Sequence, residues 1–211
     1  KWHLAMFDGQ YLEALKALET EQENIRAVMD WALSGQDIAT GTQFVLDMVD
    51  FWEVRSQAYE AEQYLTQVIN AEVEGSLLAQ ALNWRCRYRY RLGMTDASQE
   101  DGWRAITLAE QHNDQKTLIR SLIGVAYQLG LTQRKLLLER ALAIAETLGD
   151  QRLLALALNN VSNYYNNLRM YQQALDYLER SKIAYEQVGD LRGISMVLYN
   201  IGIIHIEQRN T

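Results

Sequence analysis

The residues with the clearest capacity for chemistry are four arginines in the segment WRCRYRYRLG, residues 84–93. In a helix each residue turns by about 100°, so the arginines divide into two pairs, Arg85 with Arg89 and Arg87 with Arg91. A guanidinium carries a planar fork of donors that binds carboxylate or phosphate groups in a bidentate manner. One interpretation of the segment is therefore an anion-binding site, with Arg87 and Arg91 as the favoured pair.

The same segment also has an interpretation as packing, because an apolar stripe at helical spacing runs between the two arginine pairs. This stripe predicts a buried aromatic seam whose flanking arginines cover apolar surface with their stems and keep their charged ends in water. We favour this packing interpretation and keep the anion-binding site as the alternative. The stripe consists of Leu77, Ala81, Trp84, Tyr88 and Leu92.

Nothing else in the sequence suggests catalysis or a cofactor. His3, His112 and His205 stand far apart, and none has a second metal-ligand type at helical spacing beyond isolated acids. There is no GxxxxGK[ST] loop, no strand-led glycine fingerprint and no GxSxG motif. We therefore expect no catalytic residue, no metal and no cofactor, and any ATPase activity would reside in a domain outside this chain.

Composition limits the class of protein. The chain has 211 residues, 48% of them hydrophobic, with no alternating apolar runs, which predicts an all-helical protein with a continuous core. A single cysteine excludes an internal disulfide, and no run of about 18 apolar residues predicts a membrane span, so we expect a cytoplasmic protein without membrane contact. A net charge of −7 disfavours direct nucleic-acid binding. The first residues, KWHLAMFDGQ, lack an initiator Met and a signal-peptide organisation, so we expect a segment of a longer protein.

A helical repeat organises most of the chain. Acidic residues recur at intervals of 40, 36 and 40, and one further aspartate extends the series backwards by 37. Self-similarity at this period is typical of stacked helix pairs in which each unit covers the apolar face of its neighbour. We predict repeats over residues 37–211, with units starting near 37, 74, 114, 150 and 190 and the last one incomplete. The acidic residues are Asp37, Glu74, Asp114, Asp150 and Asp190.

The residues at these unit boundaries predict how one helix ends and the next begins. Gly149 and Gly189 each precede an aspartate and supply the left-handed conformation that ends a helix. Asn113 tolerates the same conformation and takes the same place before Asp114. The aspartate side chain can then accept hydrogen bonds from the free amides that begin the next helix.

One unit is shorter than the others. From Val125 to Asp150 there are 25 residues, whereas the equivalent stretch from Val161 to Asp190 has 29. The four missing residues fall near Leu129–Gln133, between two predicted helices. Either this turn is short or a mobile loop is absent from the chain.

The best-defined unit resembles the tetratricopeptide repeat, in the pattern large, small, aromatic, aromatic, Ala, large. The resemblance implies an all-α fold, a right-handed superhelix of antiparallel helix pairs with about 10–11 helices, known as an α-α solenoid. The period of 36–40 is longer than the usual value of about 34. The family's proline is absent, as it is from the whole chain. The matching residues are Val161, Ser162, Tyr165, Tyr171, Ala174 and Leu178.

In the tetratricopeptide arrangement, the first helix of each unit lines a concave groove. Asn159, Asn163 and Asn166 share one helix face, and amide side chains carry both a donor and an acceptor, so such a ladder could bind an extended peptide backbone. The alternative is that these asparagines only solvate an exposed face. Asn160 and Asn200 are better interpreted as packing residues, and Cys86 as a small buried residue with an inert thiol. The resemblance, with the arginine pairs, implies these groove residues: Asn83, Arg87, Tyr90, Arg91, Arg120, Tyr127, Asn159, Asn163, Asn166 and Tyr199.

The segment LETEQENIRAVMDWALSGQD, residues 18–37, is similar to the linker of bacterial STAND-type signalling ATPases. In that family it follows the nucleotide-binding and winged-helix parts, and repeats form a sensor arm. The resemblance implies that residues 1–36 are a helical lead-in or linker pair. The matching residues are Leu18, Glu21, Glu23, Asn24, Ile25, Arg26, Ala27, Trp31, Ala32 and Leu33.

These resemblances imply an interaction or effector-sensing domain of a larger signalling ATPase or transcriptional regulator. It would bind a protein, a peptide or a small anionic effector in the groove. The alternative is a stand-alone tetratricopeptide scaffold or co-chaperone-like protein, and an enzyme has no supporting set of residues. The oligomeric state stays open, a homo-oligomer included.

Overall fold

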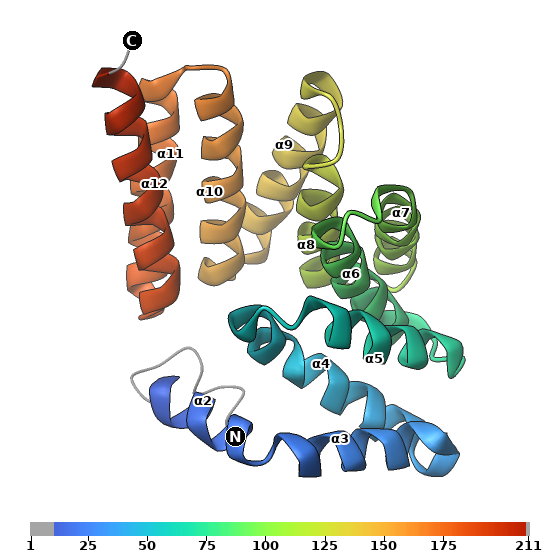
Figure 1. The fold of residues 1–211 in the computed structure, drawn as a ribbon. Helices are drawn as coiled ribbons and strands as arrows, with labels where there is room; N and C mark the ends of the chain where they lie inside the picture. The colour runs from blue at the N-terminus through green and yellow to red at the C-terminus, as the bar shows by residue number, and fades with distance from the viewer. Residues whose placement is uncertain (1–10, 210–211) are drawn as a thin grey trace. The chain divides into compact units, whose positions relative to one another are not determined.

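The computed structural model describes residues 11–209, and every regular element in this range is a helix (Figure 1). The predicted all-α fold is confirmed. The first ten residues of the predicted lead-in, including His3, lie outside the described range. No helix in residues 11–209 is both long and apolar enough to cross a membrane. The helices are α2 (Tyr11–Thr20), α3 (Gln22–Trp31), the π-helical turn η1 (Ala32–Gln36), α4 (Ile38–Arg55), α5 (Ala58–Asn70), α6 (Gly75–Arg91), α7 (Thr95–Gln111), α8 (Gln115–Ala126), α9 (Leu131–Leu148), α10 (Gln151–Asn167), α11 (Tyr171–Gln187) and α12 (Leu191–Arg209).

The chain divides into two compact units, residues 1–124 and residues 125–211. Among the described residues, the first unit holds α2 to α7 and most of α8, and the second holds the end of α8 and α9 to α12. Within each unit, helices that follow one another pack side by side, as α6 does with α7 and α10 with α11 (Figure 1).

Aspartate side chains begin four of these helices, as the sequence predicts. In each case one carboxylate oxygen accepts a hydrogen bond from the backbone amide three residues later, which satisfies a donor that the first turn leaves free. Glu74 occupies the same place before α6 without a side-chain cap. The capping pairs are Asp37 with Thr40, Asp114 with Thr117, Asp150 with Leu153 and Asp190 with Gly193, at 2.9–3.2 Å.

The predicted helix ends are also confirmed. Gly149 and Gly189 adopt φ values of 74° and 64°, and Asn113 adopts 54°. A left-handed residue turns the chain sharply and lets the backbone amides after it bond back to the last carbonyls of the helix. The amide of Asp114 accordingly donates to the carbonyl of Ala109 at 2.8 Å.

Asp114 does more than begin a helix. Its carboxylate accepts hydrogen bonds from the Thr117 amide at 3.0 Å, from the Thr117 hydroxyl at 2.7 Å and from the Ser76 hydroxyl on α6. Burial raises the pKa of Asp114, but the hydrogen bonds from Ser76 and Thr117 outweigh it and hold the pKa below its ordinary value near 3.8. Asp114 therefore joins the starts of two neighbouring first helices in its ionised form.

We expect Asp114→Ala to lower the free energy of unfolding at neutral pH by about 1 kcal/mol, which is typical for a lost cap. The folded pKa lies below the unfolded one, so this contribution is complete above the unfolded pKa, about 3.9, and is lost as the pH falls. Urea titrations at pH 7, 5 and 3.5 should show the gap between the two proteins narrowing. The exposed Glu100, changed to Gln, should show no such trend, and a gap constant with pH would contradict the assignment.

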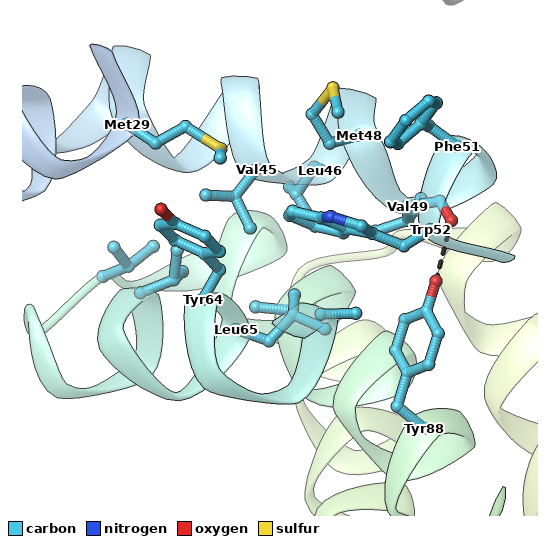
Figure 2. Packing of buried hydrophobic residues seen from close by; sticks show 14 of the residues in the cluster. Met29, Val45, Leu46, Met48, Val49, Phe51, Trp52, Tyr64, Leu65 and Tyr88 are labelled. Atoms are coloured by element: carbon cyan, nitrogen blue, oxygen red, sulfur yellow. Dashed lines mark hydrogen bonds between the residues drawn. The ribbon is translucent and has the colours of Figure 1, made fainter. Parts of the chain in front are cut away.

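The core of the first unit lies between α4, α5 and α6 (Figure 2). Trp52 is almost completely buried, and its ring stacks on that of Tyr64 with centroids 5.7 Å apart and planes at 11°. Tyr88 on α6 is fully buried and donates its hydroxyl to the Val49 carbonyl at 2.7 Å, as the dashed line in Figure 2 shows. Tyr88 thus ties α6 to α4 within the predicted seam, although Leu92 at the end of the predicted stripe is exposed. The prediction that the flanking arginines keep their charged ends in water is wrong for Arg85, which is buried and pairs with Asp101.

The short unit is short because its first helix is short. α8 has 12 residues, whereas α6 and α10 have 17 each. Arg134 on α9 donates to the carbonyls of Ala126, Tyr127 and Leu129 at 3.1–3.2 Å, which satisfies acceptors that the early helix end leaves free. The shortening therefore falls on the last turn of α8 rather than in the turn that follows it.

Two helix pairs have the same geometry and allow a residue-by-residue comparison. A shift of 76 residues places α6 on α10 and α7 on α11, with identical lengths. Where the helices cross, Ser98 of α7 donates its hydroxyl to the Cys86 carbonyl at 2.7 Å. At the equivalent crossing Ser162 of α10 donates to the Ala174 carbonyl at 2.9 Å. In the second pair Ser181 of α11 also donates its hydroxyl to the Ala155 carbonyl of α10 at 2.7 Å. Serine hydroxyls therefore join the helices of both pairs, and in α10 and α11 they come from both helices.

Candidate functional site

The first arginine pair forms a buried ion cluster between α6 and α7. Arg85 donates two hydrogen bonds to Asp101, both 2.7 Å long, and both side chains are buried. Arg89 donates to the same carboxylate at 3.0 Å and to Glu62 of α5 at 2.9 Å. The hydroxyl of Thr66 accepts a further bond from Arg85 at 3.2 Å. This pair holds helices together and is not available to a ligand.

The second pair has the opposite character. Arg87 and Arg91 both donate to Glu53 of α4, at 2.6 Å and at 2.5 and 2.9 Å. The Glu53 side chain is 5% exposed, whereas those of Arg87 and Arg91 are 46% and 42% exposed. The Arg87 guanidinium also lies 5.5 Å from the centre of the Trp84 ring, in cation–π geometry. The pairing predicted from helical spacing is confirmed, and anion binding by this pair stays a prediction.

The other candidates of the first unit are placed differently. Asn83 is buried and accepts a hydrogen bond from the Ser121 hydroxyl of α8 at 3.2 Å. Its amide therefore joins two first helices rather than lining an open surface. Arg120 on α8 is half-buried, and Tyr90 on α6 is exposed.

In the second unit, Tyr127 contacts the asparagines of α10. Its hydroxyl donates to the Asn160 side-chain oxygen and accepts a bond from the Asn163 side-chain nitrogen at 3.2 Å. Asn160 also donates to the Leu156 carbonyl at 2.7 Å. The packing role predicted for Asn160 is thus confirmed, and Asn163 lies beside it at a half-buried position.

The other residues predicted to line this groove differ in their burial and in their hydrogen bonds. Asn159 is 3% exposed and accepts a hydrogen bond from Asn200 of α12 at 2.9 Å, so its amide is occupied in helix packing. Asn166 is half-buried, and its side-chain oxygen lies buried with no hydrogen-bond partner among the described residues. Tyr199 on α12 is exposed. Asn163 and Tyr199 are therefore accessible to a ligand, whereas Asn159 and the buried oxygen of Asn166 would have to rearrange.

The contacts between neighbouring first helices share one spacing. They join residues 33–41 apart in the chain, which is one repeat, whether the partners are charged, amide or hydroxyl groups. Sequence reasoning missed Glu53, although an acid one repeat before Arg87 and Arg91 was a signal that could have identified it. Six of the candidates are considered further as two groups, one within each unit, which we call the arginine face (Arg87 and Arg91) and the asparagine face (Tyr127, Asn163, Asn166 and Tyr199).

Comparison with known proteins identifies the fold. No protein-family model and no curated protein sequence matches the chain. Solved structures, in contrast, match the chain. A Rap protein complexed with the competence and sporulation factor superposes with a TM-score of 0.76 at 13% identity, covering 98% of this chain and 57% of that one. Aspartyl phosphate phosphatase F from Bacillus subtilis gives 0.67 at 17% identity, covering 92% of this chain and 51% of that one.

A third similar structure is YrrB, a tetratricopeptide-repeat protein with an unusual peptide-binding site. It superposes with a TM-score of 0.52 at 16% identity, covering 94% of this chain and 97% of that one. The chain thus spans little more than half the length of the Rap protein and of the phosphatase. Identities this low establish architecture alone. The chain accordingly has the fold of a tetratricopeptide-like helical solenoid.

Proposed function

We propose that this chain is a protein-interaction and effector-sensing repeat domain that binds a peptide or a small anionic ligand on its first helices. The observation that carries the proposal is the arginine face, where one buried carboxylate orients two exposed guanidiniums. Two proteins of similar structure, a Rap protein complexed with the competence and sporulation factor and YrrB with its peptide-binding site, support peptide binding as the use of this fold.

The arginine face is prepared for an anion by its donors and its geometry. Two positive charges face the buried carboxylate of Glu53, and Asp50, one turn earlier on α4, is a further acid close to the same group. Each guanidinium has five donors, and the contacts with Glu53 use only part of them. Because Glu53 and Trp84 already orient the side chains, binding would require less loss of side-chain freedom than binding by mobile arginines.

The asparagine face suits a peptide backbone. Amide side chains offer one donor and one acceptor each and can pair with a peptide bond irrespective of its side chain. Among the described residues Asn163 contacts the Tyr127 hydroxyl at 3.2 Å, a bond that a peptide could replace. The Asn166 oxygen lacks a partner but is buried, so its side chain would have to rotate before it could accept one. We propose that a peptide would replace the contact between Asn163 and Tyr127.

A binding assay with short peptides tests the arginine face. Five-residue peptides with a free C-terminal carboxylate should bind more tightly than the same peptides amidated. Arg87→Gln should weaken binding of the free acids by roughly ten- to a hundredfold, because a charge-assisted hydrogen bond contributes about 1.5–3 kcal/mol. Arg91 still pairs with Glu53 in that variant, so the helical signal and melting temperature should change little.

The matched control is Arg104→Gln, which removes the same charge from an exposed position on α7. It should leave affinity unchanged. Equal weakening by both variants would mean that net charge, rather than a site, attracts the peptides. Loss of melting temperature in Arg87→Gln that parallels the loss of affinity would assign Arg87 to packing.

We further propose that the domain belongs to a STAND-type signalling ATPase, in which ligand binding alters how the repeats pack on an upstream switch. The resemblance of residues 18–37 supports this, and those residues span the end of α2, α3 and η1, immediately before the first helix pair. The gene sequence provides the test. A phosphate-binding loop encoded upstream of Lys1, or a helix-turn-helix encoded beyond Thr211, is expected, and finding neither would favour the stand-alone scaffold.

A further inference from the structure

A further exposed arginine of the first unit is held by a carboxylate in the same way as the arginine face. Arg55 is the last residue of α4, and its guanidinium forms an ion pair with Glu19 of α2. Arg91 is the last residue of α6 and forms an ion pair with Glu53 of α4. In both cases the acid belongs to the preceding first helix, about one repeat earlier in the chain. The same arrangement of acid and arginine therefore occurs twice in this unit.

Both arginines keep donors for a ligand. The side chains of Arg55 and Arg91 are 36% and 42% exposed. A guanidinium has five N–H donors. Arg55 contacts Glu19 through one terminal nitrogen, and Arg91 contacts Glu53 through two. Part of each guanidinium is therefore oriented by an acid of the protein while other donors face solvent.

A purely structural ion pair has a different character in this unit. Arg85 and Asp101 join α6 to α7, and their side chains are 7% and 2% exposed. In the pair of Arg55 with Glu19, by contrast, the acid is 41% exposed as well. Ion pairs this exposed contribute little to stability. Joining α2 to α4 is therefore a weak explanation for the position of Arg55.

The width of α4 separates the two arginines. Glu53 and Arg55 are two residues apart on this helix, so they point to nearly opposite sides of it, Glu53 toward Arg91 of α6 and Arg55 toward α2. A packed helix is about 10 Å wide. An extended peptide advances by about 3.3–3.6 Å per residue. Two peptide residues three positions apart therefore span about the same distance as the two arginines.

We infer that the partner of this surface is an extended acidic segment with two carboxylate side chains three residues apart, one bound by Arg55 and the other by the arginine face. The inference rests on the anion-binding role proposed for the arginine face and adds a second contact and a spacing. Glu19, Glu53 and the nearby Asp50 offset the arginine charges. The positions of the donors, rather than an excess of positive charge, thus determine which anions bind.

The probes are three fluorescein-labelled peptides of nine residues, built from glycine and serine and amidated at the C-terminus. One has two glutamates three positions apart, the second has the same composition with the glutamates adjacent, and the third has a single glutamate. Fluorescence anisotropy with the full chain should show that the first peptide binds roughly tenfold more tightly than the second. Once one glutamate is bound, the other reaches its arginine without a second bimolecular step.

Substitutions in the chain locate the two contacts. Arg55→Gln should reduce the affinity for the first peptide to that for the second and leave the single-glutamate peptide unchanged. Arg87→Gln should weaken all three peptides. Arg104→Gln, at an exposed position on α7, is the matched control and should keep the preference for the first peptide. The melting temperature of Arg55→Gln should stay close to that of the unchanged chain.

Several results would overturn the inference, and they separate it from the proposed function. Equal affinity for the two peptides with two glutamates, or a preference that survives in Arg55→Gln, would remove the second contact. The proposed function would stand in that case if the single-glutamate peptide still bound through Arg87. No binding of any peptide up to about 1 mM would overturn both. A fall in melting temperature that parallels the lost affinity of Arg55→Gln would assign Arg55 to joining α2 to α4.

Discussion

Asp101→Asn is expected to destabilise the first unit by about 3–5 kcal/mol, the largest effect of any substitution considered for this protein. The carboxylate lies buried between Arg85 and Arg89 and accepts three hydrogen bonds from them. Asparagine has nearly the same shape but no charge, and one of its terminal groups is a donor that would face a guanidinium. Arg85 is itself buried, so its charge would remain unbalanced inside the protein.

Tryptophan fluorescence can follow this unit selectively, because all five tryptophans of the chain precede residue 125. Urea titration of that signal should show a large shift of the midpoint for Asp101→Asn. Glu100→Gln removes the same charge from the adjacent, exposed position and should change the free energy of unfolding by less than about 0.5 kcal/mol. A loss below about 1 kcal/mol for Asp101→Asn would mean that Glu62 alone balances both arginines.

In the second unit the equivalent space between the two helices is filled without charges. The ion cluster is therefore one of two ways in which this chain fills that space. The 76-residue shift replaces Arg89 by Tyr165 and Asp101 by Tyr177, and these two rings stack with centroids 5.4 Å apart and planes at 6°. Replacing a buried ion cluster by well-packed apolar groups is often neutral or stabilising, whereas removing one partner is not. The large effect expected for Asp101→Asn is therefore the effect of an uncompensated charge.

Gly193→Ala is expected to destabilise the second unit by about 1–3 kcal/mol, although alanine favours helices over glycine. A Cβ at position 193 would lie 2.4–2.6 Å from ring atoms of Tyr185, which is buried. The ring or the start of α12 must move to admit the methyl group. Gly193 is therefore a position where α12 closely approaches α11.

Gly202→Ala on the same helix is the matched control, with the opposite expected sign. No atom lies within 4 Å of the added Cβ, so the gain in helix propensity should raise stability by about 0.5–1 kcal/mol. Thermal unfolding monitored by circular dichroism and tyrosine fluorescence compares the two variants. Equal shifts of the same sign would show that glycine at 193 has no steric role.

Much of the local structure could be predicted from residue types and spacing. The arginine pairs follow from the helical turn per residue, and the caps Asp114, Asp150 and Asp190 follow from the need of every helix start for acceptors. The aromatic seam around Tyr88 follows from the apolar stripe. In each case the physical cause acts within about one turn of helix, so a single sequence contains it.

The environments of the candidate site residues were harder to predict from the sequence. Asn83 and Asn159 share residue type and repeat position with groove residues, yet both are buried in contacts with the next first helix. Glu53 lies one repeat away from the arginines that it orients. Helical spacing states which side of a helix a residue occupies and does not state how closely the neighbouring helix covers that side.

By itself the sequence determined the helical repeat and most of the helix limits, because caps, left-handed residues and apolar periodicity act over short distances in the chain. The early end of α8 was an exception, since the sequence placed the missing residues in the following turn. Only the tertiary structure decided which polar groups join neighbouring repeats and which remain exposed. Arg85 and Arg87 are two residues apart and chemically identical, but one is enclosed by Asp101 and the other projects beyond Glu53 into solvent. Burial and charge pairing depend on groups brought together from distant parts of the chain, and these decide whether an arginine holds the fold together or is free to meet a ligand.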